Sequence, residues 1–326
     1  QTMICDELFS QHAAELRLVE ESLRTLFSNE TTVIPMIGEH IIRGGGKRLR
    51  PLFLLLSADL SGYRGEGRIM LAGVIEAIHT ASLLHDDVVD DARIRRGQTA
   101  AHNLWGNQIV ILVGDYCYAN ALKHAVRQEN LKIIETLSEA ITSMTEGEII
   151  QLNRVADPDI TLEEYYRIIS SKTGALISAA CRIGAILGGL PYDQEEALRR
   201  FGMKTGIAFQ IADDVLDYMA DEKGLGKKLG KDLEEGKITL PLICLLREAS
   251  QEEQGEIKGI LKSDSLDGDA LSRIVRLLEK YRALEESLGI AEKLIGEARE
   301  ELSVFADSPE RQALLDLAEY ALSREK

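Results

Sequence analysis

Apolar residues recur at spacings of three and four along nearly the whole chain, and this periodicity restricts the possible folds more than any other feature of the sequence. It predicts helices over about 66–91, 107–128, 131–152, 161–187 and 193–220, and several more after Lys237. Runs that alternate apolar and polar residues, as half-buried strands do, are scarce. The sequence therefore predicts an all-α protein.

Three of the expected helices also carry start signals. Thr161 with Glu164, and Asp193 with Glu196, have the spacing of a capping box. Ser308 stands before a proline, which is favoured at the first position of a helix.

Two expected helices are apolar almost all round: MLAGVIEAIHTASLLHDD at 70–87 and TGIAFQIADDVLDY at 205–218. Helices of this kind are normally buried at the centre of a large bundle. The chain has 326 residues, enough for two domains of ordinary size, but no linker or composition break divides it. We therefore expect one domain over 1–326.

The formal net charge of −16 disfavours partners that are themselves polyanions. Nucleic acid and anionic lipid are bound by basic surfaces, so neither is expected as a partner. The basic residues that stand out form three short clusters: Lys47, Arg48 and Arg50; Arg93, Arg95 and Arg96; Lys227, Lys228 and Lys231. Basic clusters in an acidic chain fit a small anionic ligand.

The cysteines and the apolar runs bear on the compartment. Cys5, Cys117, Cys181 and Cys244 lie far apart, without metal-ligand spacing, and each is among apolar residues. We expect buried free thiols in a reducing cytosol. No signal peptide is evident, and no apolar run approaches the roughly 18 residues of a spanning helix. The expectation is a cytoplasmic protein without stable membrane insertion.

Two Asp-Asp-x-x-Asp motifs, at 86–90 and 213–217, interrupt the two most apolar helices. Asp86 and Asp90 lie one turn apart on a helix, as do Asp213 and Asp217, and like charges at that spacing repel. A solvated acidic face would explain one motif on a polar helix, but buried helices need a cation to neutralise them. Oxygen ligands without His or Cys indicate magnesium or manganese, which binds a few carboxylates together with substrate phosphates. Two such motifs predict two walls that hold a diphosphate.

The segment GGGKRLRP, at 44–51, is a separate candidate for anion binding. It is not a Walker loop, because Arg48 rather than Ser or Thr follows Lys47 and no strand precedes it. A glycine-rich loop that opens a helix and carries three cations suits a second anionic group. Standing alone, the segment would be read as an ordinary basic turn.

Several segments in a fixed order carry a resemblance to a known family: GGGKRLRP, HTASLLHDDVVDDARIRRGQTAAH, LVGD, EGEIIQL, SKTGALISAA, FQIADDVLDY and GKKLGKDLEEGKITLPL. Together they span about 43–242. The sequence resembles the trans-isoprenyl (polyprenyl) diphosphate synthases, and among them the long-chain, octaprenyl-like branch. The resemblance implies a single large helical bundle of the isoprenoid synthase type with a central substrate cavity, and a homodimer.

The resemblance also implies roles for individual residues. Direct ligands of a cluster of three magnesium ions would be Asp86, Asp90 and Asp213, with Asp87, Asp214 and Asp217 as further or water-mediated ligands. The allylic diphosphate would be gripped by Arg95, Lys172 and Lys227, with Lys237 nearby. Isopentenyl diphosphate would be held by Lys47, Arg50, His79 and Arg96. The reaction centre would be lined by Thr173 and Gln210.

Two of these positions have plainer explanations. A lone histidine on an apolar helix, such as His79, is usually a satisfied core residue. Lys172 followed by Thr173 also reads as an exposed lysine beside a threonine bonded back to its own helix.

The implied reaction is ionisation followed by condensation. Metal ions and basic side chains would stabilise the departing diphosphate. The allylic cation, from farnesyl diphosphate or a similar primer, would be attacked by the double bond of isopentenyl diphosphate. Proton loss to the released diphosphate would then give a trans double bond. Repeated head-to-tail additions would give octaprenyl diphosphate or a near length, for the side chain of an isoprenoid quinone.

The residues upstream of the first motif are candidates for control of product length. Ala81 and Ser82 lie about one turn before Asp86, where short-chain relatives carry aromatic residues, and Ile78 lies in the next turn. Small side chains there predict a tunnel along the helix. The alternative is that they are tight helix–helix contacts.

Other functions are weighed against this one. A shorter-chain synthase, for farnesyl or geranylgeranyl diphosphate, shares the motifs. Class I terpene cyclases usually carry an Asn/Ser/Glu-type second motif, and non-catalytic subunits of two-component synthases typically lose Asp motifs; here both motifs are intact. A plain acidic helical interaction protein would leave the paired motifs unexplained.

Overall fold

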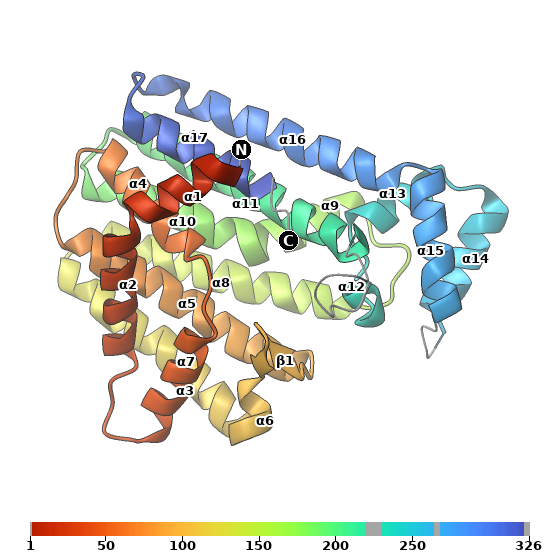
Figure 1. Ribbon diagram of the computed structural model, residues 1–326, viewed down its shortest axis with the longest axis horizontal. Coiled ribbons are helices and arrows are strands. Elements are labelled where there is room, and N and C mark those ends of the chain that lie inside the picture. Colours follow the sequence, from red (N-terminus) through yellow and green to blue (C-terminus); the bar gives the residue numbers. More distant parts are fainter. Residues whose placement is uncertain (1, 220–229, 264–267, 323–326) are drawn as a thin grey trace. The chain divides into compact units, whose positions relative to one another are not determined.

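The computed structural model describes residues 2–219, 230–263 and 268–322, and helices account for most of this part of the chain (Figure 1). The prediction of an all-α protein is confirmed. The elements in chain order are α1 (Thr2–Gln11), α2 (Ala13–Leu26), α3 (Val33–Arg43), α4 (Leu49–Leu60), α5 (Gly67–Val89), β1 (Ile94–Arg95), β2 (Gln98–Thr99), α6 (Ala101–Trp105), α7 (Asn107–Ala125), a 3-10 turn (Val126–Gln128), α8 (Leu131–Asn153), α9 (Leu162–Ile169), a π-helical turn (Ser170–Gly174), α10 (Ala175–Leu187), α11 (Tyr192–Met219), α12 (Lys231–Glu234), α13 (Leu240–Glu248), α14 (Gln251–Leu261), α15 (Gly268–Lys280), α16 (Ala283–Glu301), a 3-10 turn (Leu302–Val304) and α17 (Pro309–Leu322).

Two of the expected start signals are present. The Thr161 hydroxyl accepts from the Glu164 backbone N–H at 3.1 Å, and the Glu164 carboxylate accepts from the Thr161 N–H at 3.0 Å. The Ser308 hydroxyl accepts from the backbone N–H of Arg311 at 3.1 Å and so caps α17. The capping box expected at Asp193 is wrong, because α11 begins at Tyr192 and Asp193 lies within its first turn.

The chain divides into two compact units, each assembled from separate stretches. Among the described residues, unit 1 contains 2–142, 176–202 and 301–317. Unit 2 contains 143–175, 203–219, 230–263, 268–300 and 318–322. The division falls within α8, α11 and α17, so each unit draws on several parts of the sequence. A single domain over 1–326 stays a prediction.

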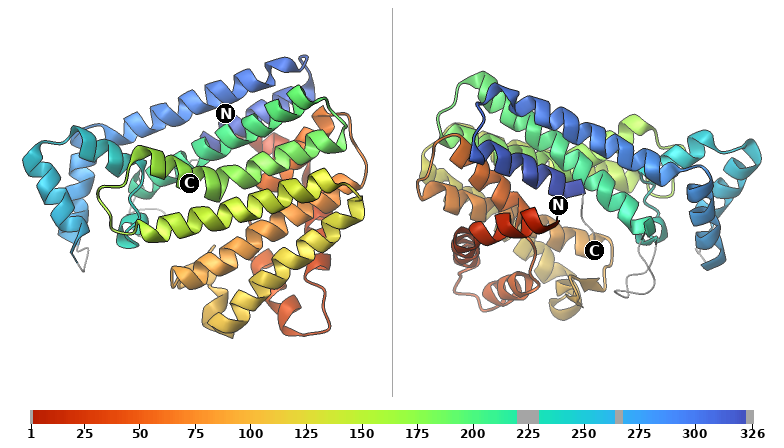
Figure 2. Two further views of the ribbon diagram at one scale, coloured as in Figure 1. Left: turned by 180° about the vertical axis from the view of Figure 1, so that it is seen from behind. Right: turned by 45° about the horizontal axis from the view of Figure 1, so that its top comes forward.

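In unit 1, α5 packs against α2, α4 and α7, and the three views show it running beside α7 (Figures 1 and 2). Its apolar residues from Leu71 to Ile78 are all buried, as the all-round apolar pattern predicts, whereas Val89 at its end is exposed. The last turn of α5 is held against α7 by His85. Its imidazole lies where a side chain at Gly114 would be, and its Nε2 lies 3.0 Å from the carbonyl of Ile111. The first Asp motif therefore ends a core helix whose position is set by packing.

α5 is also long and apolar enough, by length and composition, to cross a membrane, although no such run was expected. In this structure 67% of its most apolar 18-residue window is buried inside the protein. The core helix of a soluble protein passes the same test, so this observation is weak evidence for a membrane span.

In unit 2, the π-helical turn lies directly against α11. A Cβ on Gly206 would stand 2.7 Å from the Cα of Gly174, so glycine at both positions lets the two backbones touch. At another part of the unit, α14 and α15 lie side by side (Figures 1 and 2), joined by Arg273 and Glu256 at 2.8 Å.

Three cysteines, Cys117, Cys181 and Cys244, are free and buried, as expected. Burial raises the pKa of Cys117 and of Cys181 to about 12. These thiols are therefore protonated and unreactive at neutral pH.

Candidate active site

The first Asp motif occupies the end of α5, where its carboxylates divide into two kinds. Asp87 is buried and accepts hydrogen bonds from Nε and Nη2 of Arg95, at 2.7 and 2.5 Å. Asp86 and Asp90 are only partly buried, and the Asp90 N–H donates to the Asp86 carbonyl at 2.8 Å as the helix ends. Asp87 therefore orients an arginine, while the pair one turn apart borders the surface of the unit.

A short hairpin, β1–β2, follows this motif and was not expected from the sequence. Arg95 pairs with Gln98, so the loop consists of Arg96 and Gly97, whose φ angles are 49° and 76°. Positive φ at both loop residues is the type I′ turn, which matches the twist of a two-residue hairpin. Burial lowers the pKa of Arg95, but bonding to Asp87 outweighs it, so the net pKa is raised. The hairpin thus presents two consecutive arginines beside the motif.

Arg96 is held by the glycine-rich segment. Its Nη1 donates to the Gly45 carbonyl, and a Cβ on Gly46 would lie 2.9 Å from that same nitrogen. Gly46 also has a φ of 139°, which L side chains rarely adopt. Burial and the nearby arginines together lower the pKa of Arg96. The glycines therefore serve the close approach of a cation to the backbone.

Arg48 does not act as one of three ligand cations in this segment, contrary to expectation. It is 5% exposed, pairs with Glu76 at 2.8 Å and also lies 3.2 Å from Glu20. Its backbone is left-handed, with a φ of 52° at the N-cap of α4. Its charge is therefore paired within the fold.

His79 lies beside Arg50, with 3.2 Å between Nε2 of the histidine and Nη1 of the arginine. Desolvation lowers the pKa of His79 well below its usual value, and the charges of Arg50 and Arg96 lower it further. The imidazole is therefore neutral at physiological pH, and its Nε2 accepts from the guanidinium. This contact is compatible both with a satisfied core histidine and with a histidine that orients Arg50.

The two arginines of the hairpin and Asp87 of the first motif border one cavity of unit 1. It lies between α3, α5 and the hairpin, and its lining includes Leu83, Leu84, Asp87, Arg95 and Arg96. The cavity is thus apolar on the α5 side and cationic at the hairpin.

The residues predicted to control product length lie on α5. Ala81 and Ile78 are fully buried. Ser82 is partly buried, and its hydroxyl donates to the carbonyl of His79 at 2.8 Å. The absence of an aromatic ring there is consistent with either a tunnel or a close helix contact.

The second motif, on α11 in unit 2, shows a similar division. Asp214 is 3% exposed and accepts at Oδ2 from the Tyr165 hydroxyl, at 2.6 Å, and at Oδ1 from the Gln210 amide, at 2.9 Å. Burial raises the pKa of Asp214 well above its usual value, and the charge of Asp232 raises it further, although the two donors counteract this. Asp213 is partly buried.

Asp217 has a third environment. Its Oδ1 and Oδ2 accept from the backbone N–H groups of Lys231 and Asp232, at 3.2 and 3.0 Å, so it caps the start of α12. Burial raises the pKa of Asp217, and these two hydrogen bonds counteract the rise. The carboxylate ties the second motif to the segment that leads to Lys237.

Lys172 and Thr173 lie in the π-helical turn and face different partners. Lys172 pairs with Glu148 and donates to Gln151 at 2.5 Å. Thr173 is 5% exposed, and its hydroxyl donates to Oε1 of Gln210 at 2.6 Å. A threonine bonded back to its own helix is therefore not what the structure shows.

A cavity of unit 2 adjoins these residues and is lined by Lys172, Gln210, Asp214, Asp232 and Lys237, among others. Lys237 lies 2.7 Å from Glu235. Burial and the charge of Asp217 raise the pKa of Asp232 to about 7. Lys227, the other cation predicted for the allylic diphosphate, lies outside the described residues.

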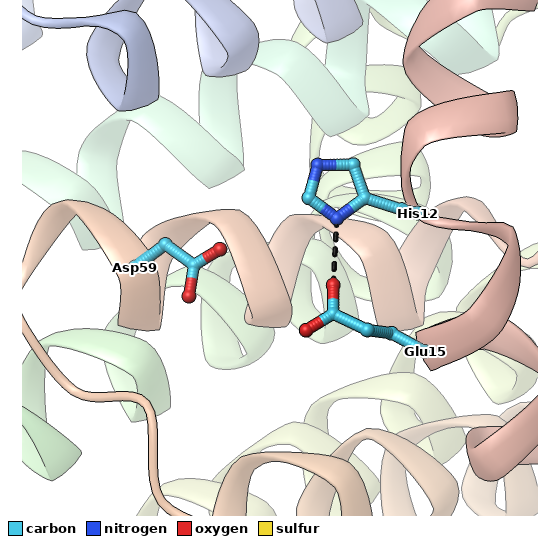
Figure 3. Close-up of side chains that lie close together, drawn as sticks. All are labelled: His12, Glu15 and Asp59. Atoms are coloured by element: carbon cyan, nitrogen blue, oxygen red, sulfur yellow. Dashed lines mark hydrogen bonds and ion pairs between the residues drawn. The ribbon is translucent and has the colours of Figure 1, made fainter.

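A separate group of possible metal ligands occurs in unit 1, where His12, Glu15 and Asp59 lie close together (Figure 3). Their ligand atoms are within 4.8 Å of one another. Arg68 pairs with Glu15 and lies 3.6 Å from Asp59, so a guanidinium already supplies positive charge. Arg68 also precedes Asp86 by 18 residues on one helix, about 27 Å, so this group is remote from the first motif.

Sequence reasoning missed three polar residues around the second motif. Glu148 and Gln151 lie in the segment EGEIIQL, which contributed to the resemblance without a role for either residue. Tyr165 follows the capping box at Thr161 by four positions, and nothing local marks it as a partner of Asp214.

Comparison with known proteins agrees with this arrangement. Residues 31–278 match the family model of polyprenyl synthetase. Octaprenyl diphosphate synthase of Escherichia coli (strain K12) is 38% identical over 314 residues, covering 96% of this chain and 97% of the relative. A crystal structure of a decaprenyl diphosphate synthase from Rhodobacter capsulatus has a TM-score of 0.92 at 40% identity, covering 98% of this chain and 99% of that one. A crystal structure of a polyprenyl synthase from Caulobacter crescentus CB15, complexed with calcium and isoprenyl diphosphate, has a TM-score of 0.92 at 37% identity. It covers 98% of this chain and 97% of that one. The chain belongs to the polyprenyl synthetase family and is a prenyltransferase.

Proposed function

We propose that the protein is a long-chain trans-polyprenyl diphosphate synthase. It adds isopentenyl diphosphate, head to tail and in sequence, to an allylic primer such as farnesyl diphosphate, and supplies the side chain of an isoprenoid quinone. The observation that carries this proposal is the division of labour in each motif. Asp87 and Asp214 are buried and bonded to protein donors, while Asp86, Asp90 and Asp213 are partly exposed.

The residues of both motifs fit magnesium ions. The donors are carboxylate oxygens, the ligands preferred by hard divalent cations, and the relative from Caulobacter crescentus was crystallised with calcium, a cation of the same preference. Asp86, Asp90 and Asp213 would bind a cluster of three ions directly, with manganese as a substitute. Asp87 and Asp217 would be further or water-mediated ligands of these ions, and the family resemblance implies the same role for Asp214. The ions would supply electrostatic stabilisation of the departing diphosphate.

The cationic side chains divide between two substrates. Arg95, Lys172, Lys227 and Lys237 would bind the allylic diphosphate, and Lys47, Arg50, His79 and Arg96 would bind isopentenyl diphosphate. The fixed position of Arg95 on Asp87 favours bidentate contact with a phosphate. A neutral His79 fits its role because it holds Arg50 without adding charge to an already cationic group.

The reaction centre uses oxygen dipoles. The oxygens of Thr173 and Gln210 would stabilise the allylic cation after ionisation. Water must be excluded so that the cation is captured by the double bond of isopentenyl diphosphate rather than by water.

We propose octaprenyl diphosphate, or a near length, as the product. The relatives named above differ in product length, from octaprenyl to decaprenyl, so overall similarity does not decide it. The support from this chain is local: Ile78, Ala81 and Ser82, below the first motif on α5, carry no aromatic ring that would block a growing tail.

We also propose a homodimer. α7 exposes Ile109, Ile111 and Leu112, by 40%, 41% and 66% of their surface. Contiguous apolar residues on one helix are typical of a protein interface.

The test is incubation of the purified protein with farnesyl diphosphate, isopentenyl diphosphate and magnesium, followed by mass analysis of the products. The proposal expects magnesium-dependent release of diphosphate and linear products near octaprenyl length. Products that stop at geranylgeranyl length would indicate the shorter-chain alternative, and cyclic hydrocarbons a terpene cyclase. No turnover of any allylic diphosphate would indicate a non-catalytic subunit.

A further inference from the structure

Four side chains of unit 2 form one hydrogen-bonded chain across α9, the π-helical turn and α11. The hydroxyl of Tyr165 donates to Asp214 at 2.6 Å, and the amide of Gln210 donates to the other oxygen of Asp214 at 2.9 Å. The hydroxyl of Thr173 donates to Oε1 of Gln210 at 2.6 Å. Three of the four side chains, those of Tyr165, Thr173 and Asp214, are at least 95% buried.

The direction of each hydrogen bond follows from which group carries a proton. The Tyr165 hydroxyl carries one proton, and at 2.6 Å it donates that proton to Oδ2 of Asp214. Asp214 in turn decides which way the Gln210 amide faces. Oδ1 of Asp214 accepts from the amide and Oε1 of the amide accepts from Thr173, so turning the amide over would break both of these hydrogen bonds. The carboxylate therefore keeps the NH₂ group of Gln210 toward itself and the oxygen toward Thr173.

We propose that Tyr165 and Asp214 are positioning residues, which fix the amide of Gln210 and, through it, the hydroxyl of Thr173 in the orientation needed at the allylic cation. This inference rests on the proposed function and deepens it. Asp214 thereby serves the reaction centre and is not a magnesium ligand, although it stands within the second motif.

The backbone around these side chains supports a fixed geometry. The π-helical turn contains Thr173, and π turns inside α-helices often occur at functional sites. Gly174 and Gly206 touch, and this contact brings the turn within hydrogen-bonding distance of α11. Tyr165 closes the other end, at the start of α13. Since both ends are anchored, loss of one hydroxyl leaves the backbone in place and frees only the amide.

The experiment compares Tyr165→Phe and Asp214→Asn with the wild-type enzyme in steady-state condensation of isopentenyl diphosphate with farnesyl diphosphate. We expect kcat to fall about tenfold in Tyr165→Phe and about 10–100-fold in Asp214→Asn, as for other residues that orient a catalytic group. The KM of each diphosphate and the magnesium concentration for half-maximal activity should stay within about twofold of wild type. Tyr166→Phe removes the same hydroxyl one position later, from a ring that packs edge-on against that of Tyr165, and is the control for loss of a hydroxyl.

A double-mutant cycle separates positioning from a merely structural role. In a Gln210→Met background there is no amide to orient, so Tyr165→Phe should have little further effect on kcat. If Tyr165 and Asp214 only stabilise the fold, the losses in the single variants will add in the double variant. The unfolding temperature of each variant, measured alongside, identifies any loss due to unfolding.

Three results would overturn the inference while leaving the proposed function intact: an unchanged kcat in Tyr165→Phe, additive losses in the double variant, or a raised magnesium requirement in Asp214→Asn with normal kcat at saturation. Absence of condensation in the wild-type enzyme would instead overturn the proposed function. If Asp214→Asn fails to fold, the Tyr165 and Gln210 variants still decide the question.

Discussion

Arg48 and Glu76 form a buried ion pair between the start of α4 and the middle of α5, with 2.8 Å between Nη1 and Oε1 and each side chain 4% exposed. Arg48 also donates to the carbonyl of Ile42, which precedes the glycine-rich segment. The pair therefore anchors the segment that supports Arg96.

Glu76→Ala should lower the free energy of unfolding by about 3 kcal/mol, because the buried guanidinium loses its buried partner and keeps only the partly exposed Glu20. Urea denaturation measures this change. Glu39→Ala is the control: it breaks pairs with Arg24 and Arg43 that are exposed, and should cost less than about 1 kcal/mol. Equal changes in the two variants would show that the buried pair does not anchor α4.

Asp86→Ala, Asp90→Ala and Asp213→Ala should each reduce turnover by about two orders of magnitude or more, while leaving the fold intact. The reason is loss of a ligand for the ions that stabilise the departing diphosphate. Measurement of kcat over a magnesium titration checks this. Asp91→Ala is a matched control, since Asp91 adjoins the first motif but its side chain is 95% exposed. Near-normal kcat in Asp86→Ala at saturating magnesium would contradict the metal assignment.

Arg96→Ala should mainly raise the KM of isopentenyl diphosphate, whereas Lys227→Ala should mainly impair the allylic substrate. Gly46→Ala should resemble Arg96→Ala, because the new Cβ would displace the guanidinium. Gly259→Ala, where nothing lies within 4 Å, is the control for the substitution. The measurement is initial rate against each substrate in turn. If Arg96→Ala and Lys227→Ala weakened the same substrate, the division into two sites would be wrong.

The buried environment of His79 predicts a pH dependence of stability. Its pKa is lowered in the folded protein, so below about pH 6.5 the unfolded chain takes up a proton that the folded one does not. The free energy of unfolding should therefore fall as the pH drops through 6.5, by about 1 kcal/mol between pH 7.5 and 5.5. His79→Gln should lack this contribution. Urea denaturation of both proteins at the two pH values measures the change in the free energy of unfolding. An equal change in wild type and His79→Gln would exclude a contribution from the titration of His79.

Ala81→Tyr should shorten the product to about geranylgeranyl length while early additions keep their rate, because the ring would close a tunnel along α5. Mass analysis of the products is the measurement. The competing explanation, a tight helix contact, predicts a different pair of results: reduced thermal stability, since Ala81 is fully buried, and an unchanged product length.

The sequence alone determined the class of the fold and the chemistry of its site. Helical periodicity and scarce strand patterns predicted α5, α7, α8 and α11 to within a few residues, because each long helix must bury one continuous stripe. The repeated Asp motif predicted oxygen ligands for a cation, because carboxylates on apolar helices need neutralisation.

Tertiary structure alone decided the environment of each carboxylate in the two motifs. Within a motif the aspartates are chemically identical, and they differ only through partners that folding delivers from elsewhere: Arg95 for Asp87, Tyr165 for Asp214, and the start of α12 for Asp217. The same is true of Arg48, which looked like a ligand cation until Glu76 and Glu20 met it in the core. Local periodicity records which face of a helix is buried, but the identity of the group opposite depends on contacts between residues 8 to 49 positions apart, which the periodicity does not encode.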